Sequence, residues 1–422
     1  MTESGGRPVE TICVMGLGYV GLPTAAVFAV NGFRVIGVDL RQEVVESVNT
    51  AGLASGEIGL KTLVQAAVNS GNLRAQLEPQ AADAFIIAVP TPMREDHVAD
   101  LSYVEGAARS ILPYLSKGNL VILESTSPPG TTDGMLTRIL SESGLLPKQD
   151  LSVAYCAERV LPGRILAELV ENDRVIGGVD QESGHRAAAM YRRVVEGNIV
   201  VTSATMAEVV KLIENAYRDV NIAFANEVAR ISRQWGVDGR DAIRLANRHP
   251  RVDILHPGPG VGGHCIPVDP WFLVQHSPNL AKLVQVAREV NDAMPAWVAE
   301  RTLMEVRGVR DPKISVWGVA YKANVDDARE TPALPVIRAL EAEGARVSAV
   351  DFHVSGFQYP LDDLLTSVTG ADCILLLTDH REFALVEPGS VRERMRTRIV
   401  FDTRGCLRHR QWEKHGFRVV TL

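Results

Sequence analysis

The fold is decided by one stretch near the N-terminus, Ile12-Cys13-Val14-Met15-Gly16-Leu17-Gly18-Tyr19-Val20-Gly21-Leu22-Pro23. An apolar strand runs into the pattern Gly-x-Gly-x-x-Gly, and an apolar helix from Pro23 to about Val30 follows. In this pattern Gly16 allows a tight turn, Gly18 lets the backbone approach a pyrophosphate, and Gly21 lets the helix pack on the strand. The N-terminus of that helix is then free to bind the phosphates. The stretch therefore predicts a dinucleotide-binding βαβ unit.

The next strand indicates which dinucleotide binds. Residues 33–39 form a second apolar strand that ends in Asp39, 18 residues after Gly21. A carboxylate at this place accepts hydrogen bonds from the adenosine ribose hydroxyl groups and repels the 2′-phosphate of NADP, so NAD is favoured. Arg41, two residues on, leaves NADP open. The alternative is a glycine-rich turn that binds nothing, and the order of strand, glycines, helix and acid makes it the weaker interpretation.

Length and composition limit the class of protein. A chain of 422 residues exceeds what one hydrophobic core usually supports, so two or three domains are expected. The hydrophobic fraction of 46% and the charged fraction of 23% are typical of a soluble globular protein. A formal charge of −7 argues against nucleic acid as a general partner. No signal peptide or membrane-length apolar run is readable, so we expect a cytoplasmic protein without a membrane partner.

The cysteines point away from disulfides and metals. The chain has five, at positions 13, 156, 265, 373 and 406, an odd number without paired spacing. This fits a reducing compartment, and no His/Cys cluster with metal-ligand spacing is present in the sequence, so no metal site is expected. Cys13 and Cys373 lie in apolar runs, while Cys156 and Cys406 follow strands, so we expect all four to be core residues.

Periodicity predicts an α/β fold, with two Rossmann-like doubly wound domains joined by a long central helix. Buried parallel strands are expected at residues 84–89, 120–123, 151–155 and 199–201, with a helix over residues 101–115. One long helix covers residues 204–235, and alternation resumes after Pro312 with segments at 313–319, 332–343, 346–350, 372–377 and 398–401. The predicted domains are an NAD-binding domain at residues 1–203, a central helical region with Cys265 at 204–305, and a second α/β domain at 306–422.

We expect a homodimer through the long helix, because the apolar part of its circumference exceeds what one domain could cover.

Two loops after strands carry hydroxyl groups where an open α/β sheet binds its ligand. Thr91 follows the strand at residues 84–89, and Thr126 follows the strand at 120–123. Ordinary turn and N-cap chemistry is the alternative for both residues. Their place at the carboxyl ends of strands favours a ligand site.

The long helix carries a polar stripe. Lys211, Asn215 and Asp219 stand at i, i+4 and i+8, with Arg218 beside them. Such spacing usually marks a solvated face. Here apolar residues occupy much of the remaining circumference, so we expect the stripe to be buried and to need partners or a ligand. A lysine in such a site can polarise a developing oxyanion or move a proton.

The most informative thiol is Cys265, which lies in the run Gly258-Pro259-Gly260-Val261-Gly262-Gly263-His264-Cys265-Ile266-Pro267-Val268-Asp269-Pro270. A cysteine among four glycines, with Asp269 four residues on, is poorly placed to fill a core. Together with the nicotinamide cofactor it predicts an oxidation that passes through a thioester. The alternative is a glycine-rich linker with an incidental thiol.

Seven segments in order carry a family resemblance: 16–23, 124–128, 158–163, 211–215, 247–252, the Cys265 loop and 322–330. On these segments the whole chain resembles the UDP-glucose/GDP-mannose dehydrogenase family, and most closely its branch specific for UDP-N-acetyl-D-mannosamine. The resemblance implies that a sugar C6 alcohol is oxidised to a carboxylate with two NAD. Cys265 would attack the aldehyde, and the thiohemiacetal would lose a second hydride to give a thioester that water hydrolyses.

The resemblance also implies roles for individual residues. Lys211 would assist proton transfer with Asn215, Asp269 would orient Lys211 or water, and Glu158 and Thr126 would serve hydrolysis. The cofactor would contact a set that also includes the loop glycines: Gly16, Gly18, Tyr19, Val20, Gly21, Asp39, Thr91, Thr126 and Arg329. The UDP-sugar, bound by the second α/β domain, would contact Arg159, Val160, Lys211, Asn215, Arg218, His249, Arg251, Gly262, Tyr321, Lys322 and Arg404, and several of these cations suit its two phosphates.

Two of these residues have a purely structural alternative: His249 could cap a helix end, and Arg329 could pair with Asp326 or Asp327 on the surface. Two other function classes stay open from the sequence. One is a dehydrogenase for a small hydroxy or amino acid that stops after one hydride transfer, and the other is a non-catalytic NAD-binding regulator. Within the preferred class, oxidation of UDP-N-acetylglucosamine or UDP-glucose at C6 remains the alternative.

Overall fold

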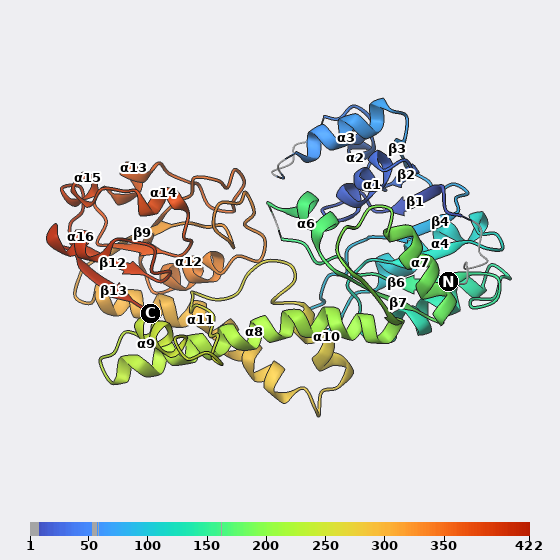
Figure 1. Cartoon of the computed structure of the whole chain (residues 1–422). Helices are drawn as coiled ribbons and strands as arrows, with labels where there is room; N and C mark the ends of the chain where they lie inside the picture. The colour runs from blue at the N-terminus through green and yellow to red at the C-terminus, as the bar shows by residue number, and fades with distance from the viewer. Residues whose placement is uncertain (1–7, 53–56, 58, 162) are drawn as a thin grey trace. The chain divides into compact units, whose positions relative to one another are not determined.

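The structure is a computed structural model, and it describes residues 8–52, 57, 59–161 and 163–422. It divides into two compact units. The first contains the chain up to Glu214 together with Gln275–Ser277, and the second contains Asn215–Val274 and Pro278–Leu422. Figure 1 shows both units, and each is described here by itself. Pro162, which falls in one of the family segments, lies outside the described residues.

An eight-stranded sheet forms the centre of the first unit, with the order β3-β2-β1-β4-β5-β6-β7-β8. The strands are β1 (Thr11–Met15), β2 (Arg34–Val38), β3 (Leu73–Gln76), β4 (Ala84–Ile87), β5 (Leu120–Leu123), β6 (Ser152–Tyr155), β7 (Arg174–Gly178) and β8 (Ile199–Ser203). The first six in this order run parallel, from β3 to β6. Their carboxyl ends therefore lie along one edge, where an open sheet of this class binds its ligand.

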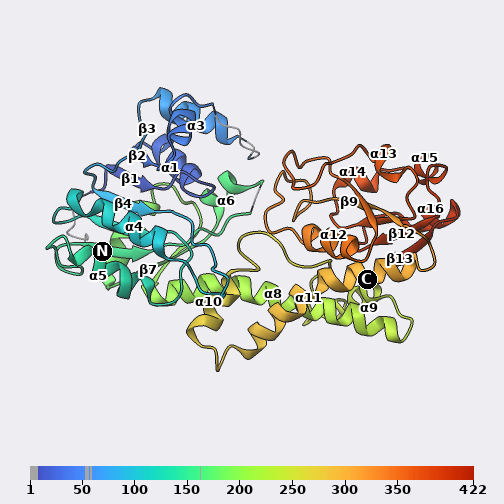
Figure 2. The same cartoon turned by 180° about the vertical axis from the view of Figure 1, so that it is seen from behind.

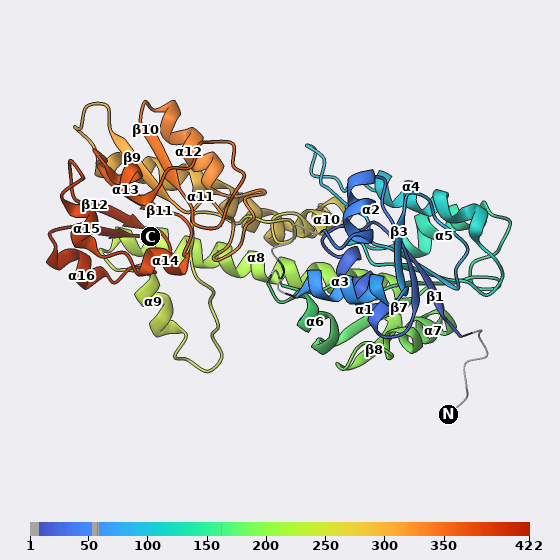
Figure 3. The same cartoon turned by 90° about the horizontal axis from the view of Figure 1, so that it is seen from above.

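Helices cover both faces of this sheet. They are α1 (Gly21–Val30), α2 (Gln42–Asn49), α3 (Leu60–Asn69), α4 (Ser102–Ile111), η1 (Leu112–Tyr114), η2 (Thr131–Leu136), α5 (Thr137–Ser141), α6 (Ile165–Glu171) and α7 (Gln181–Tyr191). Apolar residues of α1, α3, α6 and α7 form one core cluster, and those of α4 and α5 belong to the other. Figure 3 shows the two groups on opposite sides of the strands. The doubly wound arrangement predicted for the first half is confirmed.

The predicted run of buried parallel strands is wrong at one end of this sheet. β7 pairs with β6 in antiparallel direction, and β8 runs parallel to β7. β8 is an edge strand whose residues are half-buried or exposed, whereas burial was expected at residues 199–201. The sequence interpretation missed β7 altogether, because a strand that begins with Arg174 does not show the apolar start typical of a core strand.

The predicted long helix is present as α8 (Ala204–Gln234), which Figure 1 draws as one continuous ribbon. It contains 31 residues. The border between the two compact units falls inside it, between Glu214 and Asn215. The shorter helices that follow are α9 (Gly239–Ala246), α10 (Asp269–His276) and α11 (Lys282–Glu305).

The second unit contains a five-stranded parallel sheet with the order β10-β9-β11-β12-β13. Its strands are β9 (Lys313–Trp317), β10 (Arg346–Val350), β11 (Cys373–Leu376), β12 (Ile399–Asp402) and β13 (Arg418–Thr421). α11 and α12 (Ala333–Ala342) pack on one face. The other face carries α13 (Leu364–Val368), α14 (Arg381–Ala384), α15 (Pro388–Arg392) and α16 (His409–Lys414). Figure 2 shows this second α/β layer arrangement from behind, and it confirms the predicted fold class.

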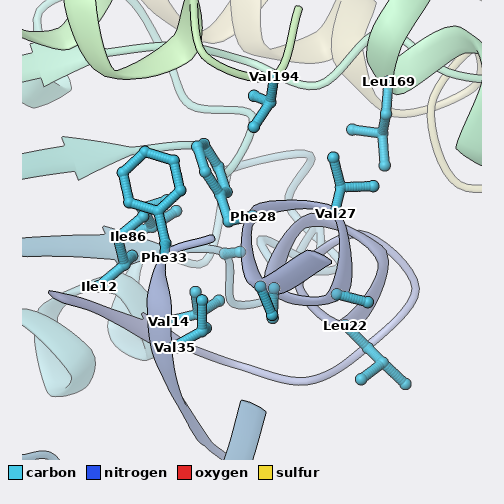
Figure 4. Close-up of a cluster of buried hydrophobic side chains, with 14 of the residues drawn as sticks. Ile12, Val14, Leu22, Val27, Phe28, Phe33, Val35, Ile86, Leu169 and Val194 are labelled. Carbon is cyan, nitrogen blue, oxygen red and sulfur yellow. The ribbon is translucent and has the colours of Figure 1, made fainter. Parts of the chain in front are cut away.

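The turn after β1 depends on two glycines. Gly16 has a φ of +95°, which favours glycine, and its N–H donates to the carbonyl oxygen of Val38 over 2.7 Å. A Cβ atom on Gly21 would lie 1.9 Å from the carbonyl oxygen of Gly16. Only glycine at position 21 therefore lets α1 begin this close to β1. The close start directs Val27 and Phe28 of α1 into the core that Figure 4 shows.

Among the helices of the described residues, none combines the length and the apolar character needed to cross a membrane.

The first prediction concerns this turn. We expect Gly21→Ala to lower the free energy of unfolding by about 1–3 kcal/mol, because the backbone of the turn has to move. Gly18→Ala is the matched control, since no atom of the described residues lies within 4 Å of the Cβ position and its φ is outside the left-handed region. Thermal unfolding of both variants checks this, and equal losses in the two would contradict the steric account.

Candidate functional site

Among the described residues, Gly18 is the glycine of this loop whose backbone is open to a ligand. At Gly18 the space around a Cβ atom is open among the described residues, whereas at Gly16 the nearest atom, the carbonyl oxygen of Ala88, would lie 2.8 Å away. Gly21 is crowded in the same way. Tyr19 is exposed and Val20 is half-buried at the start of α1. The loop thus fits a pyrophosphate that approaches Gly18 and the N-terminus of α1.

Asp39 follows β2 directly and is oriented by the loop it faces. One of its carboxylate oxygens accepts the N–H of Leu17 over 3.1 Å, and the other accepts the N–H and the Nε–H of Arg41. The ion pair between Arg41 and Asp39 measures 3.2 Å. The carboxylate is therefore held at the edge of the sheet, next to the glycine loop, as the sequence predicted for a ribose-binding acid.

Three further predicted residues follow the next three strands along the same edge. Thr91 follows β4, Thr126 follows β5 and Glu158 follows β6. Both threonines are half-buried and Glu158 is buried. The Oγ of Ser125 donates to the carbonyl oxygen of Val89 over 2.7 Å, so the first two loops are joined to each other. The parallel order of β1, β4, β5 and β6 places Gly18, Thr91, Thr126 and Glu158 in sequence along one edge.

Glu158 is fixed at both carboxylate oxygens. Oε2 accepts a hydrogen bond from Nη1 of Arg174 over 3.0 Å, and Oε1 accepts the N–H of Arg159 over 2.6 Å. The side chains of Arg174 and Glu158 are 3% and 7% exposed, so this is a buried ion pair. The sequence interpretation did not find Arg174. Its only signal is a charge at the start of an apolar segment, which does not reveal its partner.

Arg159 and Val160 continue this loop. Nη1 of Arg159 donates to Glu214 Oε1 over 2.6 Å, and its other terminal nitrogen donates to the carbonyl oxygen of Asp173. Val160 packs against the first core cluster as a half-buried residue. The guanidinium group predicted to contact substrate phosphates is thus oriented by neighbours of the first unit.

The polar stripe of α8 is buried, as expected. Lys211 is 8% exposed, Asn215 1% and Asp219 0%. Nδ2 of Asn215 donates to Oδ2 of Asp269 over 2.5 Å, and Arg218, which is exposed, donates to Oδ1 of Asn215. Asp219 accepts from Arg288 of α11 over 2.5 Å. Asn215 thus links the stripe directly to the cysteine segment.

Three asparagines of α8 hold the segment that contains Cys265. Asn215 binds Asp269 at its end, Asn226 accepts the N–H of Gly258 over 2.8 Å at its start, and Asn221 accepts the N–H of Leu255 over 2.9 Å. The carbonyl oxygen of Cys265 accepts the N–H of Asp269 over 2.8 Å. Cys265 is exposed, whereas Cys13, Cys156 and Cys373 are buried as predicted. Cys406 is half-buried, so the prediction that it is a core residue is only partly confirmed. Asn221 and Asn226 were missed in the sequence, because asparagine on a helix has no fixed meaning until its partner is known.

The cysteine loop packs against the loop between β9 and α12. A Cβ atom on Gly262 would lie 2.6 Å from the carbonyl oxygen of Glu330, and one on Gly263 would lie 2.8 Å from the ring of Tyr321. Burial, followed by the charges of Asp327 and Cys265, raises the pKa of Tyr321 to about 12. The phenol therefore stays neutral and can donate a hydrogen bond. The glycines bring Tyr321, a predicted substrate residue, beside the thiol segment.

Arg404 joins the same group from the β12 side. Its Nε donates to Asp379 over 3.0 Å, and a Cβ atom on Gly258 would lie 2.6 Å from its Nη1. Arg404 and Tyr321 line one small cavity together with residues of the cysteine loop, Pro259 and Gly260. Lys322 is half-buried in the same loop as Tyr321. Four predicted substrate residues, Gly262, Tyr321, Lys322 and Arg404, thus gather around the start of the cysteine loop.

Other predicted residues lie outside this group. Arg329 is exposed and donates to Asp327 over 2.7 Å, which is the surface pairing given as its structural alternative. His249 and Arg251 are both exposed after α9, and Nδ1 of His249 accepts the N–H of Arg251 over 3.3 Å. Neither His249 nor Arg251 is among the residues that line the small cavity beside Tyr321 and Arg404.

A carboxylate missed in the sequence organises the second sheet. Asp351, directly after β10, accepts the N–H groups of Val319 and Ala320 over 2.7 and 3.1 Å, and lies 3.0 Å from Nε2 of His380. Burial opposes ionisation, but hydrogen bonds from His380 and from backbone N–H groups prevail and hold the pKa of Asp351 well below its usual value. Asp351 thus fixes the turn that leads to Tyr321, as Asp39 does for the glycine loop of the first unit.

One group of described side chains has the spacing of metal ligands: His353, His380 and Glu382. In His380, Nδ1 accepts the N–H of Asn324 over 2.8 Å, and Nε2 is used by Asp351. Both ring nitrogens are therefore engaged, and His353 lies 3.1 Å from Glu382. The arrangement acts as a hydrogen-bonded support for Asp351 rather than as a set of available ligands.

Comparison with known proteins identifies the family. Three models of the UDP-glucose/GDP-mannose dehydrogenase family match in order: its NAD binding domain at residues 10–195, its central domain at 205–293 and its UDP binding domain at 315–409. The chain belongs to the UDP-glucose/GDP-mannose dehydrogenase family. The predicted NAD cofactor and the predicted class of enzyme, an NAD-dependent nucleotide-sugar dehydrogenase, are thereby confirmed. The two alternatives outside this class, a small-acid dehydrogenase and a non-catalytic regulator, are set aside.

Several family members are similar over nearly the whole chain. A UDP-N-acetyl-D-mannosamine dehydrogenase of Methanococcus maripaludis is 47% identical over 431 residues, which cover 100% of this chain and 99% of that protein. An NDP-N-acetyl-D-galactosaminuronic acid dehydrogenase of Ralstonia solanacearum is 47% identical over 410 residues, covering 94% and 96%. Among solved structures, the UDP-D-ManNAc dehydrogenase from Pyrococcus horikoshii has a TM-score of 0.92 at 40% identity, covering 97% and 98%.

The second prediction concerns Asp351 of this family member. Because its folded-state pKa lies below the unfolded value of about 4, the carboxylate stabilises the fold above that pH and loses this effect as pH falls. We expect Asp351→Asn to lower the free energy of unfolding by about 2–3 kcal/mol at pH 7. Denaturant unfolding between pH 7 and pH 3 should show the difference from the wild type shrinking below about pH 4. Glu343→Gln, at an exposed carboxylate of the same unit, is the control. A difference that stays constant with pH would contradict the account.

Proposed function

We propose that this dehydrogenase oxidises the C6 alcohol of UDP-N-acetyl-D-mannosamine to the uronate, in two hydride transfers that consume two NAD+. The observation that carries the proposal is an exposed thiol, Cys265, on a loop that α8 holds at both ends, in a chain of this family. The substrate is supported by the full-length similarity to proteins named UDP-N-acetyl-D-mannosamine dehydrogenase.

Cys265 supplies the covalent step. NAD+ accepts a hydride in each of the two oxidations. An aldehyde has no readily transferred hydride until a nucleophile adds to it, and the thiolate of Cys265 provides this addition. The S–C bond gives a thiohemiacetal, loss of its C6 hydrogen as hydride gives a thioester, and water then breaks the C–S bond to release the carboxylate. The loop glycines leave the sulfur accessible to a sugar carbon.

The proposed catalytic residues each have a position that suits the task. Lys211, buried one turn before Asn215 on α8, stabilises the oxyanion and moves the alcohol proton. Asn215 and Asp269 bind each other and hold the cysteine segment. Glu158, kept at the strand edge by Arg174, acts as the base for the hydrolytic water, with Thr126 on the neighbouring loop.

The proposed ligand residues divide between the units. In the first unit, NAD contacts the glycine loop with Gly16, Gly18, Tyr19, Val20 and Gly21, and also Asp39, Thr91 and Thr126; Arg329 completes the set. The UDP-sugar contacts Arg159, Val160, Lys211, Asn215, Arg218, His249, Arg251, Gly262, Tyr321, Lys322 and Arg404. The cations of this second set match the two phosphate charges of the ligand. The functional domains are proposed as residues 1–203, 204–305 and 306–422, in a protein of the cytoplasm.

A second candidate substrate class rests on a specific observation. Proteins named NDP-N-acetyl-D-galactosaminuronic acid dehydrogenase are as similar, at 47% identity, as those named for the mannosamine sugar. UDP-N-acetylglucosamine and UDP-glucose are the further alternatives. NADH release with purified protein and a panel of UDP-N-acetylhexosamines that differ at C2 and C4 distinguishes them. A clear preference for a sugar other than UDP-N-acetyl-D-mannosamine would overturn the substrate assignment.

The third prediction tests the thiol. Cys265→Ser is expected to lose the second oxidation, so that NADH per sugar falls from two to one or less and turnover to uronate falls by at least about 10³-fold. Cys406→Ser is the matched control, because burial raises the pKa of that thiol to about 12. Product analysis by chromatography and NADH absorbance measures both. Two NADH per sugar at the wild-type rate in Cys265→Ser would contradict the mechanism.

We also propose that the protein forms a homodimer through α8. Five large apolar side chains of this helix are exposed, at spacings of seven and four residues: Met206, Ile213, Tyr217, Phe224 and Ile231. At 100° per residue these five fall within about 20° of one line along the helix, and the exposed Trp235 follows directly after its end. A continuous apolar stripe with this repeat is the pattern by which two helices pack together. A second copy of the same helix offers a matching stripe.

The fourth prediction concerns this stripe. The double variant Tyr217→Glu and Phe224→Glu, with exposed fractions of 63% and 52% at its centre, is expected to convert a dimer to a monomer. Thr205→Glu, exposed on α8 but off the stripe, should leave the dimer intact. Sedimentation or light scattering measures the mass. A wild-type monomer, or a dimer unaffected by the double variant, would contradict the proposal.

A further inference from the structure

The buried Arg174 forms part of a network that the proposed chemistry does not yet explain. It stands at the first position of β7 and is 2% exposed as a whole residue. Nη1 donates to Glu158 over 3.0 Å, and Nη2 donates to the carbonyl oxygen of Leu169 over 3.2 Å. A buried charge is stable only when it is paired and hydrogen-bonded. The pair with Glu158 satisfies this need and fixes the carboxylate in one orientation.

A small cavity lies behind the guanidinium group. It is lined by side chains of α1, α6, α7 and β7 and by residues that follow β5 and α7: Thr24, Val27, Phe28, Glu124, Leu169, Arg174, Tyr191 and Val194. Figure 4 labels four of them, Val27, Phe28, Leu169 and Val194, which form its apolar side. The volume open to the centre of a water molecule is about 10 Å³. This is close to the least that one buried water molecule needs.

Three buried polar atoms of the lining residues have no partner that meets the distance and angle of a hydrogen bond among the described residues: Thr24 Oγ1, Glu124 Oε2 and Arg174 Nε. Thr24 nevertheless lies close enough to Glu124 to lower the pKa of its carboxyl group. Buried polar groups are rarely left unsatisfied, because each costs about 1–3 kcal/mol. A water molecule in a polar cavity typically makes about three hydrogen bonds. The number of unsatisfied atoms and the volume therefore both suit one water molecule that joins Glu124, Thr24 and Arg174.

The charges of the network are balanced only when Glu124 is neutral. Burial, and next the negative charge of Glu158, raises the pKa of Glu124 to about 8, against the effect of Arg174. The other titratable groups that face it are Tyr191 of α7, whose hydroxyl donates to Oε1 over 3.3 Å, and the buried Cys156 after β6. α1 contributes only the uncharged Thr24. At neutral pH, Arg174 therefore faces one carboxylate, that of Glu158.

We propose that Arg174 is a positioning residue for Glu158 in the hydrolysis of the Cys265 thioester, and that Glu124, Thr24 and one cavity water molecule support Arg174 from behind. The inference rests on the proposed function, in which Glu158 is the base for the attacking water. The base accepts a proton from water, the oxygen bonds to the acyl carbon, and the C–S bond breaks to return the thiolate. Glu158 must be correctly aimed at the water for this step, and its hydrogen bond to Arg174 fixes that orientation.

The experiment separates hydrolysis from oxidation. Arg174→Lys keeps the charge but cannot bind Glu158 and Leu169 together. We expect steady-state turnover to fall about 10–100-fold, while the rapid first release of two NADH per active site persists. Hydroxylamine attacks a thioester through its own nitrogen, giving a hydroxamate and free thiol, so it should restore steady-state NADH release. Loss of the first release together with turnover, or no rescue by hydroxylamine, would overturn the positioning role.

Two further variants keep the test decisive if Arg174→Lys fails to fold. In the wild type, we expect steady-state turnover to decline near pH 8, where Glu124 ionises. The amide in Glu124→Gln cannot ionise, so this decline should move to higher pH. An unchanged pH profile would overturn the role of Glu124. Arg186→Lys is the matched control, since this buried arginine binds Ser152 and the carbonyl oxygen of Gly118 at the amino ends of strands β6 and β5. It should lose stability without altering the balance between the two steps.

The wild-type enzyme separates this inference from the proposed function. If neither the wild type nor Arg174→Lys yields a hydroxamate with hydroxylamine, the thioester mechanism itself fails. If a hydroxamate forms and Arg174→Lys turns over as fast as the wild type, only the inference about Arg174 fails.

Discussion

The structure of the first unit depends on how closely α1 approaches β1. The carbonyl oxygen of Gly16 occupies the space in which any side chain at position 21 would stand, 1.9 Å from the Cβ position. With glycine there, α1 packs Val27 and Phe28 into the core, where the ring of Phe28 contacts Phe33 and Tyr191 at centroid distances of 5.3 and 5.4 Å. The same helix places Thr24 against Glu124. One steric constraint therefore positions both the nucleotide loop and the support behind Glu158.

The second requirement is a fixed position for an exposed thiol on a glycine-rich loop. Glycines make such a loop costly to order, since each loses more backbone freedom on folding than any other residue. Asn215, Asn221 and Asn226 of α8 oppose this cost with hydrogen bonds to Asp269, Leu255 and Gly258. Asn226 in turn donates to Asn291 and Asp219 binds Arg288, so α11 holds this part of α8. The two ends of the loop are therefore held in place on either side of the exposed Cys265.

Sequence alone predicted the elements that are determined by residues close together in the chain. The glycine turn, the acid after β2 and the long helix need only short-range patterns, and all three were found. Burial of Lys211, Asn215 and Asp219 was also predictable from helical periodicity. β7 and the edge position of β8 were missed, because strand direction depends on pairing between distant segments. Arg174, Asn226 and Asp351 were missed for a related reason. Each derives its role from a partner that is remote in sequence, such as Glu158 for Arg174 or Val319 for Asp351.

The central claim is that the carbon undergoing oxidation becomes bonded to the sulfur of Cys265. The most direct measurement is acid quenching of the wild-type enzyme during turnover, followed by mass mapping of its peptides. The account predicts a mass increase equal to the UDP-uronyl group on the peptide that contains Cys265, appearing before the free uronate and disappearing as it forms. An unmodified Cys265 at every quench time while uronate accumulates, or the same mass on another residue, would contradict it.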